Sequence, residues 1–146
     1  MAPDKDGTTV VAGSFSGTIA FGRFTLSSAN PEDVFVARLD AAGNWLQAIQ
    51  AGSGNLCRAT ALVVGNDGTT VVGGSFSGLT IDFGAFKLTN ADNSGVGSSE
   101  DLFVARLNRA GIWTQAVRAG GTGSDLFTTL ALNAQGNIVA GGDYWQ

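Results

Sequence analysis

Short segments in which apolar and polar residues alternate run along most of the chain. In residues 101–107 this alternation puts Phe103, Ala105 and Leu107 on one face of an extended segment, as a half-buried β-strand requires. Residues 59–64, 69–76 and 112–119 have comparable patterns and are rich in β-branched and aromatic residues. We therefore predict four consecutive strands, and in the last of them we expect Trp113, Gln115 and Val117 to share a face.

Turn signals separate these segments. Asn66-Asp67-Gly68 lies between the first two strands, where glycine accepts the positive φ of a tight turn. Between the second and third strands we expect a small apolar hairpin, TIAFGRFTL in one place and TIDFGAFKL in another, each with a two-residue turn that begins with glycine. Helical periodicity is missing, so the sequence predicts an all-β chain.

The predicted strands recur in an internal repeat. DGTTVVAGSFSG returns as DGTTVVGGSFSG with eleven of twelve positions identical, at an offset of 61 residues. EDVFVARLDAAGNWLQAIQAG returns as EDLFVARLNRAGIWTQAVRAG at an offset of 68 residues, and QGNIVAGGDYWQ begins a third repeat. Repeats of four antiparallel strands are typical of β-propeller blades, and the hairpin accounts for a period above the usual 40 to 50 residues.

We divide the chain into three parts on this basis. Residues 1–58 would form a partial blade (strands two to four), residues 59–127 a complete blade, and residues 128–146 the first half of a third. These nine strands make about two and a quarter blades, whereas closed propellers have about four to eight. We therefore expect either the remaining blades of a longer chain or a homo-oligomeric ring in which a neighbour supplies missing strands.

The segments GSFSG, DVFVARLDAAGNW and ATALVVGNDG resemble the bacterial β-propeller repeat often called SBBP. The resemblance extends over almost the whole chain and implies a propeller fold in a secreted or cell-surface protein. It implies no catalytic residues.

Charge and composition exclude several kinds of function. The net charge is −4 and the eight Lys and Arg residues are scattered, which argues against nucleic acid as a partner. No apolar run is long enough to span a bilayer, so we expect no membrane insertion. Without histidine there is no Ser-His or Cys-His nucleophile, and we interpret Cys57 as a small, semi-buried residue.

Acidic residues offer two kinds of candidate site. The pairs Glu32-Asp33 and Glu100-Asp101 begin strands, and adjacent side chains there point to opposite faces, so Asp33 and Asp101 are expected to cap backbone N–H groups rather than to act as a catalytic pair. A calcium-loop spacing is present at Asn90, Asp92, Ser94, Gly95, Ser98 and Asp101. Its first and last ligands are atypical and no helix flanks it, so the alternative is a solvated polar loop that needs no cofactor.

Tryptophan recurs at Trp45 and Trp113, and we expect these rings to fill gaps between blades rather than to stack on sugars. In propellers the hairpins and the connections between blades emerge on one face. We therefore place candidate ligand-binding residues together on that face: Arg23, Asn55, Arg58, Ser124 and Asp125. The expected function is a non-enzymatic structural or interaction module with a protein ligand, and the alternative is a carbohydrate-binding, lectin-like module.

Overall fold

The computed structural model describes residues 1–52, 55–92 and 99–145, and all regular secondary structure in these ranges is β-strand. Sheet 1 contains β1 (Ala2–Pro3), β2 (Thr9–Phe21), β3 (Phe24–Leu39) and β4 (Trp45–Ala51). Sheet 2 contains β5 (Cys57–Val64), β6 (Thr70–Phe76), β9 (Asp101–Leu107) and β10 (Trp113–Ala119). β7 (Thr80–Phe83) and β8 (Phe86–Thr89) form a hairpin, and β11 (Asp125–Leu132) and β12 (Ile138–Tyr144) form sheet 3.

Every paired strand in these sheets is antiparallel, and sheets 1 and 2 have sequential strand order, so the predicted all-β, antiparallel class is confirmed. β9 has the predicted bounds, and its burial alternates with a period of two. The turn between β5 and β6 uses Gly68 at φ +79°, which a residue with a Cβ rarely adopts. In sheet 1 the position of the first strand is occupied by β1, which pairs only with Thr9 and Val10.

The expected common face of Trp113, Gln115 and Val117 is wrong. A β-bulge shifts the register, so that Trp113 pairs with Leu107 but Gln115 pairs with Arg106. Trp113 therefore lies on the opposite face of sheet 2 from Gln115 and Val117, because a one-residue shift exchanges the faces of a strand.

The apolar hairpins fold back over the sheets instead of projecting with the loops. In sheet 2 the turn glycine Gly84 lies against Trp113, at the start of β10, and Phe83 packs edge-on against the same ring with centroids 4.9 Å apart. Gly22 and Phe21 contact Trp45 in the same way in sheet 1, where the hairpin is continuous with β2 and β3. The hairpin tips are thus at the end of the sheets where β4 and β10 begin.

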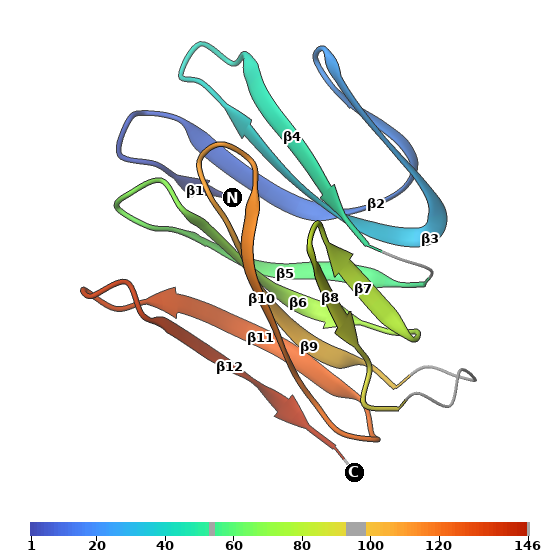
Figure 1. Ribbon diagram of the computed structural model, residues 1–146. Helices are drawn as coiled ribbons and strands as arrows, with labels where there is room; N and C mark the ends of the chain where they lie inside the picture. The colour runs from blue at the N-terminus through green and yellow to red at the C-terminus, as the bar shows by residue number, and fades with distance from the viewer. Residues whose placement is uncertain (53–54, 93–98, 146) are drawn as a thin grey trace.

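Figure 1 shows the three sheets stacked as layers, with sheet 1 uppermost and the turns that precede β2, β6 and β12 on the same side. Each sheet has two different faces. The aromatic face of sheet 2 carries Phe103, Ala105 and Trp113, and its aliphatic face carries the alternate residues of β9 and β10, namely Leu102, Val104 and Val117. By the repeat offset of 68, the aromatic face of sheet 1 carries Phe35, Ala37 and Trp45, and its aliphatic face carries Val34, Val36 and Ile49.

The main core lies between the aliphatic face of sheet 1 and the aromatic face of sheet 2. Val34, Val36 and Phe103 are 3% exposed or less, and the hairpin residues Ile81 and Phe83 fill the same layer. A second core lies between the aliphatic face of sheet 2 and sheet 3, where the Phe127 ring sits directly on Gly73. The aliphatic face of one sheet therefore packs on the next sheet at both contacts, and burial of these side chains is the main stabilising contribution.

Candidate functional site

A buried arginine connects sheet 1 with sheet 2 at the end of the sheets that holds the turns before β2, β6 and β12. Arg38, in β3, is 6% exposed and forms an ion pair with Asp4. Its guanidinium also donates to the Thr8 hydroxyl at 2.9 Å and to the Gly68 carbonyl of sheet 2 at 2.9 Å. We call Asp4, Asp6, Thr8, Arg38, Gly68 and Arg109 the turn-end cluster.

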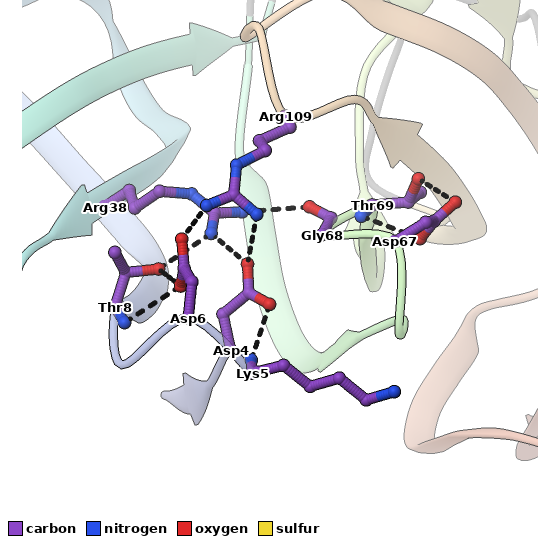
Figure 2. Close-up of polar contacts among 9 residues, drawn as sticks. All are labelled: Asp4, Lys5, Asp6, Thr8, Arg38, Asp67, Gly68, Thr69 and Arg109. Carbon is purple, nitrogen blue, oxygen red and sulfur yellow. Dashed lines mark hydrogen bonds and ion pairs between the residues drawn. The ribbon is translucent and has the colours of Figure 1, made fainter.

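Arg109 approaches this cluster from the turn between β9 and β10. Its guanidinium pairs with Asp6 and lies 3.6 Å from the Asp4 carboxylate, as Figure 2 shows. Two carboxylates of sheet 1 thus bind two arginines, one from each sheet. A buried charge is tolerated only when it is paired and hydrogen-bonded, which is the case for Arg38.

The surroundings of Asp4 favour its charged form. Burial by itself would raise the pKa of the Asp4 carboxyl, but other interactions outweigh this effect and lower the pKa from its ordinary value of 3.8. They are the hydrogen bond from Arg38, the backbone N–H of Lys5 and the charges of Arg38 and Arg109. Asp4 is therefore in its charged form over the neutral range.

The same position of the repeat makes a weaker contact between sheets 2 and 3. Arg106 corresponds to Arg38 and donates to the Gly136 carbonyl at 3.1 Å, just as Arg38 donates to the Gly68 carbonyl. The alternation of β3 and β9 puts this arginine on the aliphatic face, beside the neighbouring sheet. The Ala-Arg-Leu segment of the repeat thus provides an intersheet hydrogen bond twice.

At the other end of the sheets, polar side chains gather where the connections between sheets lie. Arg58 stands between Glu32 of sheet 1, at 2.8 Å, and Glu100 of sheet 2, at 3.7 Å. Glu100 in turn accepts a hydrogen bond from the Ser75 hydroxyl at 2.6 Å. We call Glu32, Asp33, Arg58, Glu100, Asp101 and Asp125 the loop-end cluster.

The aspartates of the repeated Glu-Asp pairs are buried, whereas the glutamates are partly exposed. Among the described residues, Asp33 accepts hydrogen bonds from the side chains of Asn30 and Gln50, and none of these residues donates a backbone N–H to it. Asp101 does accept a backbone N–H, from Ala91, and pairs with Arg118 at 2.7 Å. These carboxylates therefore connect the strand starts to neighbouring loops and to the fourth strand.

A glycine makes room for each carboxylate. A Cβ on Gly52 would lie 2.0 Å from an oxygen of Asp33, and one on Gly120 would lie 2.3 Å from an oxygen of Asp101. The repeated Ala-Gly at the end of the fourth strand is thus required by the packing of the aspartates.

The predicted ligand-binding residues are only partly brought together. Arg58 and Asp125 both contact Glu100, because the backbone N–H of Asp125 donates to the Glu100 carbonyl at 2.7 Å. Asn55 lies at the same end, against Gly78, and Ser124 is exposed next to Asp125. Arg23 is exposed over the Phe24 ring at the hairpin tip near Trp45, so its predicted place beside the other four is wrong.

Asp125 is 1% exposed, which leaves it no surface for contact with a ligand. One carboxylate oxygen accepts the Gly121 N–H at 3.0 Å, and the other has no hydrogen-bond partner among the described atoms. Arg58 is half-exposed, but its charge is already paired with two glutamates.

Among the described residues of the predicted calcium loop, the polar side chains bond to one another and to nearby backbone groups. The Asn90 side-chain oxygen accepts the Asp92 N–H, while Asn90 donates to the carbonyls of Phe76 and Ser99. Asp101 points instead to Ala91 and Arg118. Ser94 lies outside the described residues, and no cluster of three or more His, Cys, Asp or Glu side chains with metal-binding geometry is found among those described.

The recurring tryptophans pack within the fold. Trp113 is 7% exposed in the main core, and Trp45 is half-buried against Phe21. Each ring lies beneath the hairpin of its own repeat, where it packs edge-on against a phenylalanine, and Trp45 keeps part of its surface exposed.

Sequence reasoning missed the turn-end cluster. Its available signal was a charged residue, Arg38 or Arg106, at the same inward position of an otherwise apolar strand in both repeats. Asp4 had no such signal, because its counterpart in the second repeat is Gly65.

The fold and these clusters define an all-β repeat protein built of stacked antiparallel sheets with polar links between layers. No protein-family model matches the chain, and no curated protein matches it. No helix suited to crossing a membrane occurs in the described residues.

Proposed function

We propose that the chain is a non-enzymatic structural and interaction module whose sheets are successive blades of a β-propeller. The observation that carries this proposal is the repeated contact between layers. At both contacts an aliphatic face packs on the next sheet, and an arginine of the Ala-Arg-Leu segment donates to the glycine carbonyl of the next turn. Propeller blades are four-stranded sheets that pack on their neighbours in this sequential manner.

The polar clusters support a structural role. Arg38, Arg58 and Arg109 are paired with carboxylates across sheet boundaries, so their charges serve to connect layers. The resemblance to the SBBP repeat adds a secreted or cell-surface setting, and the partners that fit are further blades, from the same chain or from other copies. A protein ligand is preferred over a glycan because Trp113 is buried, and Trp45, which is only partly exposed, packs edge-on against Phe21.

The proposed function is tested with variants of the acidic loop-end cluster. Purified chain is incubated with chromogenic glycosides and esters, in parallel with the variants Asp101→Asn and Asp125→Asn, and is applied to a glycan array. We expect no turnover and no glycan bound above background. Turnover that either variant abolishes would overturn the non-enzymatic assignment, and saturable binding to a glycan would favour the lectin-like alternative.

A further inference from the structure

The aromatic faces of sheets 1 and 2 are equivalent in sequence but differ in exposure. Phe103 is fully buried and Trp113 is 7% exposed because sheet 1 covers them. Their counterparts Phe35 and Trp45 are only half-buried, and no other sheet of the described residues covers this face. Aromatic side chains that stay partly exposed on a sheet face are candidates for a contact with another protein.

Two glycines at equivalent positions of the repeat show the same difference in coverage between sheets 1 and 2. A Cβ on Gly111, in the turn before β10, would lie 3.0 Å from Ile49 and 1.8 Å from the Gln47 side chain. A Cβ on Gly43, in the corresponding turn of sheet 1, would meet nothing within 4 Å. Sheet 1 thus lacks the layer that would supply the counterparts of Gln47 and Ile49, which are Gln115 and Val117.

Gln115 and Val117 are themselves exposed, on the face of sheet 2 that points away from sheet 1. Sheet 3 has two strands and packs on β5, β6 and part of β9, so it leaves most of β10 open. The result is an apolar recess of 180 Å³ between sheets 2 and 3, lined by Leu102, Val104 and Val117 on one side and by Phe127 and residues 140–142 of β12 on the other, and Val117 is 48% exposed. Leu102, Val104 and Val117 occupy the repeat positions of Val34, Val36 and Ile49, which cover the aromatic face of sheet 2.

The edge of β2 is also suited to pairing with β11. β1 pairs with Thr9 and Val10 only, so no strand pairs with residues 11–15 of β2 on that side in the described structure. β11 has the register of β5, including a bulge at the equivalent place, and β5 pairs along all of β6. The β2 segment VVAGSF resembles the β6 segment VVGGSF more closely than the β12 segment IVAGGDY does. β2 is thus a better partner for a β5-type strand than β12 is.

We infer that the recess of one copy binds sheet 1 of a second copy. β2, β3 and β4 of the second copy join β11 of the first, β2 takes the place of β12, and Phe35 and Trp45 pack on Leu102, Val104 and Val117. This inference rests on the proposed function, since it takes the contact between sheets 1 and 2 as the template. Each copy then contributes two complete blades, and two to four copies would close a ring of about four to eight blades.

The mass of the chain in solution tests this arrangement. Light scattering after size exclusion is expected to give two to four times the chain mass of 14.8 kDa. Val117→Asp places a charge in the recess, and we expect it to weaken association at least about a hundredfold. Val139→Asp is the matched control, because Val139 is a similarly exposed valine (57%) on β12, which the arrangement displaces.

The outcomes separate this inference from its alternatives. A wild-type chain that stays monomeric throughout the micromolar range overturns binding of a second copy. An oligomer that Val139→Asp dissociates and Val117→Asp does not would also overturn it, because the second copy would then sit on the outer face of sheet 3.

A second measurement distinguishes a failure of this inference from a failure of the proposed function. In a variant with Trp45 and Trp145 replaced by Phe, acrylamide quenching of the remaining Trp113 reports the contact between sheets 1 and 2. A wild-type chain that is monomeric, together with protected Trp113 in this variant, refutes only the inference about a second copy. A monomer with freely quenched Trp113 refutes the stacking of sheets on which the proposed function depends.

Discussion

Arg38 and Arg106 occupy the same position of the repeated Ala-Arg-Leu segment, yet their surroundings differ greatly. Arg38 is 6% exposed and bonded to Asp4, Thr8 and Gly68, whereas Arg106 is half-buried and donates to Gly136. The difference arises from Asp4, which the second repeat lacks. The two arginines therefore form a natural pair for mutagenesis.

We expect Arg38→Met to lower the free energy of unfolding by about 3 to 5 kcal/mol, because it leaves the buried Asp4 carboxylate without its main partner. Arg106→Met removes one hydrogen bond near the surface and should cost about 1 kcal/mol. Urea denaturation followed by fluorescence compares the two. Equal losses would show that Arg38 contributes no more than an ordinary surface residue.

The lowered pKa of Asp4 predicts an acid dependence of stability. Because the folded-state pKa is below 3.8, the stabilisation by Asp4 is present above the unfolded-state pKa and is lost as the pH falls through the folded-state pKa. Asp4→Asn should therefore be less stable than wild type at pH 7, and this difference should shrink below about pH 4. Denaturation at several pH values measures it, with the exposed Asp143→Asn as control. A difference independent of pH would contradict the ionised pair.

At the scale of the element, a glycine that sheets 2 and 3 share in the middle of the second strand has different neighbours in these two sheets. In sheet 2, Gly73 supports the Phe127 ring of sheet 3, and a Cβ there would lie 2.2 to 2.8 Å from three ring atoms. At the equivalent Gly141 of sheet 3, a Cβ would meet only a Thr129 methyl group at 3.1 Å. The first glycine is therefore part of a layer contact, and the second is not.

Gly73→Ala is expected to destabilise the chain by about 1 to 3 kcal/mol, because the new methyl group would clash with the Phe127 ring and force the ring to shift. Gly141→Ala should change stability by less than about 1 kcal/mol, since a small rotation of Thr129 relieves its contact. Thermal unfolding measured by circular dichroism gives both values. A neutral Gly73→Ala would mean that sheet 3 does not pack on sheet 2 in this way.

At the scale of the whole molecule, each layer contacts only its neighbours, so stability is expected to vary along the stack. β6, an inner strand of sheet 2, is buried at every residue, whereas most residues of β12 are exposed. In hydrogen exchange of the monomeric Val117→Asp variant, amides of β12 should exchange at least about a hundredfold faster than those of β6 and β9. Uniform protection of all strands would contradict a stack with a weak outer layer.

Much of the architecture could be predicted from the sequence because it depends on local pattern. The bounds of β9, the turn at Gly68 and the two hairpins follow from alternation and from turn residues, which act over a few positions. The bulge near Trp113 could not be predicted, since it depends on how β10 fits against β9. The place of Arg23 was wrong for a related reason, because the hairpin folds back to cover the Trp45 ring.

The sequence by itself determined that the chain is all-β, that its strands recur, and that Phe103, Ala105 and Leu107 share one face of β9. Tertiary structure alone decided which faces meet, that Asp4 and Arg109 join Arg38 between two sheets, and that Phe35 and Trp45 stay partly open while Phe103 and Trp113 are buried. The physical reason is that equivalent residues have the same local preferences, but their burial depends on the neighbour that each sheet has in space.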